Sequence, residues 1–194
     1  MRATPESGRA RAGGNRYAVL LRGVNVGGHR RIRMADLRLL LEDLGYRDVV
    51  TYLQSGQAAL TATDQDERAV QERVAAALAE RIGTPVDVLV AGHAYLRSVI
   101  DQCPFPTADI EGKQLHAAFM DRRIDPAPLD RIESAAFAPE RCALGDRVLY
   151  LWLPGGIGRS TLAQAVLRRT VVGRDTVVTV RNWNTVIRLA ELTA

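Results

Sequence analysis

The sequence predicts an α+β protein of two tandem ferredoxin-like units, each with the element order β-α-β-β-α-β and an antiparallel sheet, plus a C-terminal helix. Apolar runs of strand length alternate with segments whose apolar residues recur at helical spacing, and this order occurs twice in 194 residues. Hydrophobic residues make up 47% of the chain and charged residues 25%, as expected for a packed core under an ordinary globular surface.

The first unit is expected to span residues 17–91. Its strands are predicted at 17–21, 49–53, 57–62 and 86–90, where short apolar runs are bounded by turn residues. A helix is predicted over 34–44, because its leucines fall on one face and Gly45 can end it. A second helix is predicted over 64–82, with Asp64 as the cap and Glu67 three residues later.

The second unit is expected to span residues 92–194, with the boundary near Gly92. A linking helix over 93–102 opens it, and an extra helix over 183–192 closes it. Between them, the same apolar patterns predict strands at 115–119, 142–144, 147–153 and 176–180 and helices around 129–132 and 162–169.

Composition excludes several classes of protein. Residues 1–16 are rich in Gly, Ala, Ser and Arg without an apolar period, and are predicted to be a disordered basic tail. This tail carries +3 of the formal charge of +4, so nucleic acid is not expected as a partner. No apolar run has the length of a membrane helix, so no membrane association is expected. Cys103 and Cys142 lack metal-ligand spacing, which predicts no metal site and a cytoplasmic protein with reduced thiols.

The loop after the first strand is the first candidate site. It contains several arginines and no acidic residue, and its glycines allow main-chain N–H groups to approach an anion. The strand order expected for this fold places the next hairpin turn at the same end of the sheet. The predicted ligand-binding residues here are Arg22, Gly23, Asn25, Gly27, Gly28, Gln54, Ser55 and Gly56. An ordinary loop and an ordinary hairpin turn are the alternatives.

The second candidate site is in the second unit, again where two strands end together. A helix N-terminus favours anions there, although Leu153 and Arg159 replace the Gly and Lys of a nucleotide-hydrolysing P-loop. The predicted ligand-binding residues are Gly158, Arg159, Ser160, Arg181, Asn182, Asn184 and Thr185. As alternatives, Ser160 and Asn182 cap the helices that follow them, and Arg181 pairs with Asp175 or Glu191.

Four segments together resemble the bacterial domain-of-unknown-function 1697 family: LLRGVNVGGHRRIRMADLRLLLEDLG at 20–45, TYLQSG at 51–56, GIGRSTLAQAVL at 156–167 and RNWNTV at 181–186. The resemblance covers roughly residues 17–192. It implies two ferredoxin-like subdomains, and it implies no reaction, substrate or cofactor. Relatives typically have Asn in place of Gln57 and commonly have Thr in place of Val180. They often have Lys in place of His29, and a position that accepts both residues needs a donor or a cation, which argues against His29 as a catalytic base.

Three functions are compatible with these patterns. The favoured one is binding of a small anionic or nucleotide-like ligand at the Gly-rich loops. The alternatives are a nucleic-acid-binding module, although the strand at 57–62 lacks aromatic residues, and a non-catalytic oligomerisation or regulatory module. His93 is expected to begin a helix and His116 to lie on an exposed strand face. No catalytic constellation is recognised, so the sequence leaves open whether the protein is an enzyme, and it indicates neither a cofactor nor an oligomeric state.

Overall fold

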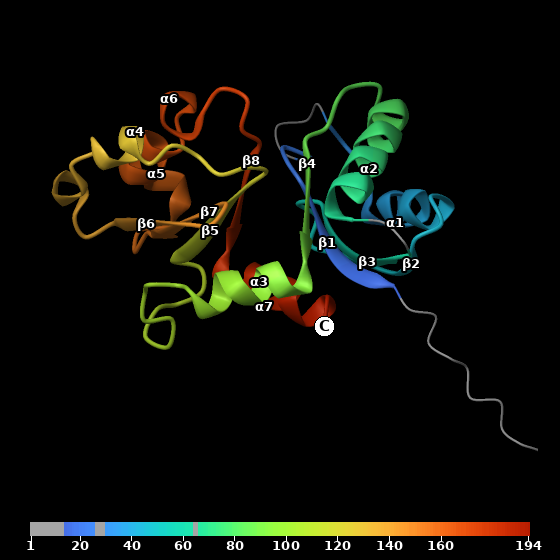
Figure 1. The fold of residues 1–194 in the computed structure, drawn as a ribbon, viewed down its shortest axis with the longest axis horizontal. Coiled ribbons are helices and arrows are strands. Elements are labelled where there is room, and N and C mark those ends of the chain that lie inside the picture. The colour runs from blue at the N-terminus through green and yellow to red at the C-terminus, as the bar shows by residue number, and fades with distance from the viewer. Residues whose placement is uncertain (1–13, 26–29, 64–65) are drawn as a thin grey trace, which may run out of the picture.

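The computed structural model describes residues 14–25, 30–63 and 66–194. The chain forms two four-stranded antiparallel sheets, as predicted, and the structure places them side by side (Figure 1). The first has the strand order β2-β3-β1-β4 and the second the order β6-β7-β5-β8, so both have the ferredoxin-like order. The elements of the first unit are β1 (Asn15–Leu21), α1 (Met34–Asp43), β2 (Arg47–Tyr52), β3 (Gln57–Ala62), α2 (Glu67–Ile82) and β4 (Val88–Gly92), and α3 (His93–Asp101) is the linking helix that follows them.

The second unit repeats this order with shorter helices. Its elements are β5 (Leu115–Met120), α4 (Ala127–Asp130), the 3-10 helix η1 (Ser134–Phe137), β6 (Arg141–Gly145), β7 (Val148–Trp152), the 3-10 helix η2 (Ile157–Arg159), α5 (Thr161–Val166), α6 (Arg169–Val172), β8 (Val178–Asn182) and α7 (Trp183–Leu192). The single helix predicted over 162–169 is therefore two, because Arg168 has extended backbone angles.

The repeat extends to individual hydrogen bonds. Leu21 N–H donates to the Gly56 carbonyl at 2.9 Å, and Met120 N–H donates to the Arg147 carbonyl at 2.8 Å. Gly56 and Arg147 thus occupy equivalent places before β3 and β7, and both have left-handed backbone, with φ of 77° and 53°. The two units therefore share main-chain hydrogen bonds even at positions where their residue types differ.

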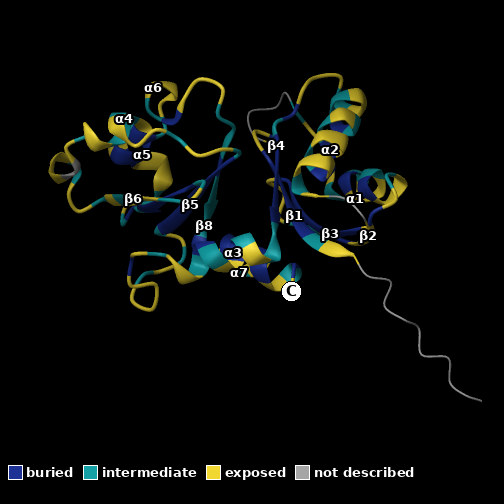
Figure 2. Cartoon of the chain, in the orientation of Figure 1, coloured by how far each residue is buried: buried dark blue, intermediate teal, exposed yellow. Residues whose placement is uncertain are grey.

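The two sheets share a central core. Helices α1 and α2 cover one face of the first sheet, and α5 covers one face of the second (Figure 2). The other faces, which include Leu20, Leu89 and Phe119, pack together with α3 and α7. Each sheet consequently has one face buried in its own unit and one buried between the units, an arrangement that the sequence patterns did not predict.

Three expectations about local structure are corrected. Asn15 and Arg16 belong to β1, because their backbones pair with β3; of the predicted tail, residues 1–13 lie outside the described chain. Asp64 also lies outside it, and the observed cap of α2 is Asp66, whose carboxylate accepts from Ala69 N–H at 2.8 Å. His116 is buried rather than exposed, because the second sheet is covered on both faces.

Candidate functional site

The loop after β1 and the turn before β3 meet at one end of the first sheet. The Asn25 side-chain amide donates to the Gln54 carbonyl at 2.7 Å and to the Ile32 carbonyl at 2.9 Å, and its oxygen accepts from Ile32 N–H at 3.0 Å. The predicted proximity of these two segments is confirmed. Asn25 thus holds the loop and the turn together, and it does so from a left-handed backbone with φ of 58°.

Gly56 is required by close packing at this place. A Cβ atom there would lie 2.9 Å from Cγ2 of Val24 and 3.0 Å from Cβ of Leu21, and its φ is positive. Beside it, the Ser55 hydroxyl donates to the Gln57 side-chain oxygen at 3.1 Å. Gly27 and Gly28 lie outside the described residues, so their predicted ligand role stays a prediction.

The guanidinium groups of Arg22 and Arg30 lie beside the end of β1. Arg22 forms a 3.0 Å ion pair with Asp87, and both side chains are about 40% exposed. Arg30 Nη1 lies near Gly23, 3.6 Å from where a Cβ atom would be. Two guanidinium groups and one carboxylate, that of Asp87, therefore lie near the end of β1.

Arg181 connects the second candidate site to the first. From β8 it extends to the end of β1, where Nη2 donates to the Leu21 carbonyl at 2.7 Å. Nη1 donates to Thr179 Oγ1 and to the Val180 carbonyl, both at 2.8 Å, and the buried Nε has no hydrogen-bond partner. No described carboxylate pairs with this guanidinium, and burial lowers the pKa of Arg181 to about 10. The expected alternative, a pair with Asp175 or Glu191, is not observed.

The remaining residues of the second site have structural contacts. Ser160 is buried and caps α5 by accepting from Ala163 N–H at 2.8 Å. The Glu140 carboxylate accepts from the Ser160 hydroxyl at 3.0 Å and from Leu162 N–H at 3.1 Å, so an internal anion already occupies the start of this helix. Arg159 is exposed on η2, and no contact between described residues joins it to Arg181. A shared ligand space for these two arginines stays a prediction.

Asn182 caps the last helix, α7, which is the structural alternative that the sequence offered for this residue. Asn182 Oδ1 accepts from Thr185 N–H at 3.0 Å and from the Thr185 hydroxyl at 2.9 Å. The side-chain amide of Asn184 packs directly against Gly112, and a Cβ atom on residue 112 would collide with it. These contacts explain the polar residues at the start of α7 without a ligand, and their predicted ligand role is untested.

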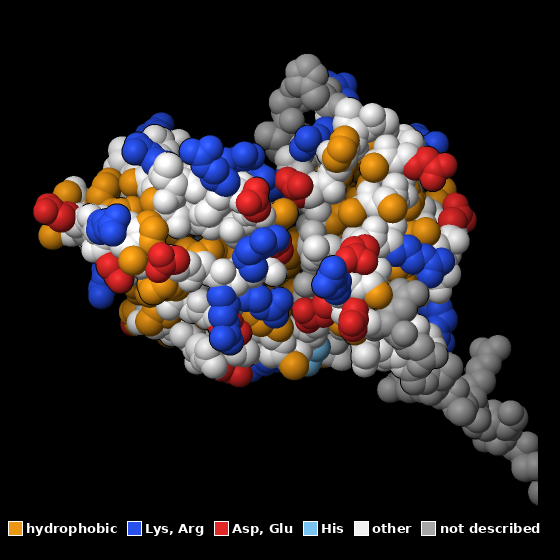
Figure 3. Space-filling view, turned by 45° about the horizontal axis from the view of Figure 1, so that its top comes forward, with side chains coloured by type: hydrophobic (Ala, Val, Ile, Leu, Met, Phe, Trp, Pro, Cys, Tyr) orange, Lys and Arg blue, Asp and Glu red, His pale blue; other side chains and the backbone are white. Residues whose placement is uncertain are grey.

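A cleft between the two units contains none of the predicted site residues. Its volume is about 430 Å³, and its lining residues come from both units: Glu67, Arg68, Gln71 and Glu72 of α2, Leu89 and Val90 of β4, and Asp121, Arg122 and Arg147 of the second unit. Arginines and carboxylates gather there over the middle of the molecule (Figure 3). No pattern in the sequence pointed to this cleft, because its lining comes from elements of both units and the equivalence of Arg147 with Gly56 is seen only in the strand pairing.

A family described as "Protein of unknown function (DUF1697)" matches residues 15–150. The chain belongs to this family. Among solved structures, "conserved bacterial protein SP0830" from Streptococcus pneumoniae is similar, with a TM-score of 0.74 and 20% identity over 94% of this chain and 100% of that one. At this identity the likeness shows the fold alone. No curated protein matches the chain.

Membership of the DUF1697 family assigns no chemistry, so a functional site can be inferred only from the side chains of this chain. Within residues 14–25, 30–63 and 66–194, no three His, Cys, Asp or Glu side chains are grouped as metal ligands would be. No helix in those ranges is long and apolar enough to cross a membrane. The arginines of this DUF1697 protein, at the end of β1 and in the cleft, are the groups that invite a functional interpretation.

Proposed function

We propose that the protein binds a small anionic or nucleotide-like molecule at the end of β1, beside the loop that begins at Arg22 and the turn at Gln54–Gly56. One observation supports this most strongly: the half-buried Arg181 guanidinium, with its Nε fully buried, reaches this place and has only neutral oxygens as partners. Buried charges in proteins are generally paired with an opposite charge. An anion bound nearby would provide the negative charge that the described residues do not.

The surrounding side chains suit such a ligand. Arg30 and Arg22 are accessible from solvent and can donate charge-assisted hydrogen bonds, Arg22 with the donors that its ion pair with Asp87 leaves unused. The unpaired charge of Arg181 adds to the positive potential at this point, and a low-dielectric surrounding weakens it less than water would. Asn25 is occupied by backbone groups, so its role in this proposal is to shape the loop.

A thermal-shift titration with inorganic phosphate at constant ionic strength tests the proposal. Phosphate tenfold above its Kd should stabilise the parent protein by about 1.4 kcal/mol. In Arg181→Gln the phosphate affinity should fall about tenfold, because an interaction with a charged group is worth about 1.5–3 kcal/mol. Without phosphate, the stability of this variant should change little, since the lost hydrogen bonds are offset by removal of an unpaired buried charge.

Arg174→Gln is the matched control, because Arg174 is an exposed arginine in the loop before β8. It should respond to phosphate as the parent does. The proposal is wrong if phosphate at millimolar concentration stabilises neither protein, or if Arg181→Gln and the parent are stabilised equally. A purely structural Arg181 would instead lower the unfolding free energy of the variant and leave phosphate affinity unchanged.

A further inference from the structure

The cleft between the units contains an arginine whose hydrogen-bond donors are unused. The Arg147 guanidinium lies over the Tyr95 ring, 4.3 Å from its centroid, and Tyr95 is anchored by its hydroxyl, which donates to the carbonyls of Arg147 at 2.9 Å and Asp146 at 3.1 Å. Its Nη1 forms a long ion pair with the Glu67 carboxylate at 3.7 Å, a distance too long for a hydrogen bond. No described residue accepts a hydrogen bond from the Arg147 side chain, which is 31% exposed.

Arg147 has a left-handed backbone conformation, which is unusual for an arginine. Its φ of 53° is a conformation in which glycine is favoured, and the first unit has Gly56 at the equivalent place. An arginine is thus held where glycine would be the easier residue. Residues in such conformations persist where the surrounding structure holds them, and they are frequent at ligand sites.

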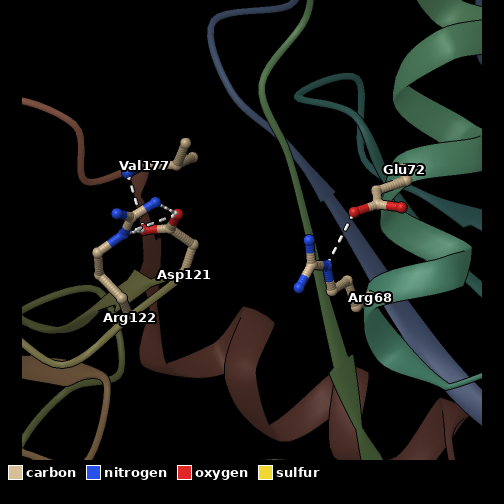
Figure 4. Close-up of polar contacts among 5 residues, drawn as sticks. All are labelled: Arg68, Glu72, Asp121, Arg122 and Val177. Carbon is tan, nitrogen blue, oxygen red and sulfur yellow. Dashed lines mark hydrogen bonds and ion pairs between the residues drawn. The ribbon is translucent and has the colours of Figure 1, made fainter.

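The carboxylates of the cleft are already engaged. Glu67 Oε1 accepts from Gly92 N–H at 2.8 Å, and Asp121 accepts from Val177 N–H at 3.0 Å and from Arg122. Glu72 accepts from Arg68 Nε at 2.8 Å. Figure 4 shows the Arg68–Glu72 pair and the Arg122–Asp121 pair on facing sides of the cleft. Each of these carboxylates thus has at least one hydrogen-bond donor of its own, whereas the five N–H donors of the Arg147 side chain have no hydrogen-bond acceptor among the described residues.

We infer that this cleft is a second binding site, in which Arg147 holds the oxyanion of a small molecule that carries a phosphate or carboxylate group. The planar guanidinium matches such groups in a bidentate manner, and its position on Tyr95 orders it before the ligand arrives. Arg68 and Arg122 are exposed enough to turn toward the same ligand. The volume of about 430 Å³ admits a small metabolite, and Leu89 and Val90 offer it apolar contact.

This site is separate from the one at the end of β1, because it uses different arginines from different elements. Its lining carries three arginines and three carboxylates, so it lacks the strong positive charge that a nucleic-acid backbone requires. A ligand there would contact both units, since α2 and β4 belong to the first and Asp121, Arg122 and Arg147 to the second. Binding should therefore also strengthen the contact between the units.

The test is a titration of the full chain followed by the backbone amide resonances of Leu89, Val90 and Asp121. Inorganic phosphate is the probe in one arm and citrate in the other, both at constant ionic strength, so that the arms distinguish phosphate from carboxylate recognition. In the parent, we expect at least one probe to shift these resonances with saturation at millimolar concentration. Arg147→Gly should bind that probe at least tenfold more weakly and remain folded, because glycine suits the left-handed backbone.

Arg147→Lys retains the charge and loses the planar fork, so its affinity should fall between those of the parent and Arg147→Gly. Arg123→Gln is the matched control, because Arg123 pairs with Asp146 next to Arg147 and does not line the cleft. Both Arg123→Gln and Arg181→Gln should bind as the parent does. Absence of saturable shifts in the parent overturns the inference, as does undiminished binding by Arg147→Gly. Loss in Arg181→Gln alone would place the anion at the end of β1 and would also overturn it.

Discussion

Arg181 and Arg147 show how differently one residue type can be accommodated. The terminal nitrogens of Arg181 donate three hydrogen bonds, to the neutral oxygens of Leu21, Val180 and Thr179, and its buried Nε has no partner. Arg147 is held by a ring face and keeps its donors free. The first arrangement leaves a buried charge without an opposite charge, and the second leaves an oriented guanidinium open to a cleft. Each arrangement is the basis of one of the two proposed anion sites.

His116 provides a prediction at the same scale. Only 6% of this residue is exposed, its Nδ1 has no partner, and burial lowers the pKa of its imidazole. The folded state therefore binds the proton less tightly than the unfolded state, in which the pKa is about 6.5. The unfolding free energy should fall as the pH drops below about 6.5.

Replacement of His116 by Gln should reduce this loss. Urea unfolding at pH 7.5 and pH 5.5 measures it: the difference between the two pH values should be smaller in His116→Gln than in the parent. An equal difference in both proteins would show that His116 does not contribute to the acid sensitivity.

At the scale of elements, the start of α5 depends on two side chains. Ser160 caps the helix, and Glu140 accepts hydrogen bonds from both Ser160 and Leu162. Ser160→Ala removes the cap and one partner of Glu140, so it should lower the unfolding free energy by about 1–2 kcal/mol. Urea denaturation measures this change. Thr161→Ala, at the exposed neighbouring position, is the control and should have little effect.

If Ser160→Ala were as stable as Thr161→Ala, the capping contacts would not be stabilising α5. The same comparison separates a cap from a ligand group. A residue retained only for an external anion would weaken phosphate binding on replacement without a cost in stability.

For the whole molecule, the shared core determines how the chain unfolds. Leu20 and Leu89 of the first sheet and Phe119 of the second are buried in one cluster with α3 and α7. If one sheet unfolded, the inner face of the other sheet would be exposed to water. We therefore expect both units to unfold in one cooperative transition.

The tryptophans allow this to be measured, because both are in the second unit, at Trp152 and Trp183. Leu78→Ala removes a fully buried side chain from the first unit and should cost about 2–5 kcal/mol. Tryptophan fluorescence from the second unit should then report a lower urea midpoint, coincident with that from circular dichroism. Leu39→Ala, at a leucine that is 57% exposed, should leave the midpoint nearly unchanged.

An unchanged fluorescence midpoint in Leu78→Ala, together with a lowered circular dichroism midpoint, would show that the units unfold independently. In that case the contact between the sheets would contribute little to stability.

Local pattern predicted most of the elements and the strand order, because apolar periodicity depends on neighbours along the chain. The bounds of β3 and α7 agree with those expected. Strand ends were less predictable: β4 and β8 begin two residues later than expected, since their bounds follow from pairing with β1 and β5. Helix caps were predicted where the side chain acts locally, as at Asn182, and were misplaced at α2, where Asp66 serves instead of Asp64.

The sequence by itself determined the α+β class, the two repeated units, the meeting of Asn25 with Gln54 and membership of the family that its four segments resembled. These follow from periodicity, turn chemistry and strand direction, which act within a unit. Only the tertiary structure decided that the sheets share a core, that Arg181 reaches Leu21, and that Arg147 faces Glu67 across a cleft. Those contacts depend on how one unit packs on the other, and that packing is set by side-chain shape over surfaces far apart in the sequence.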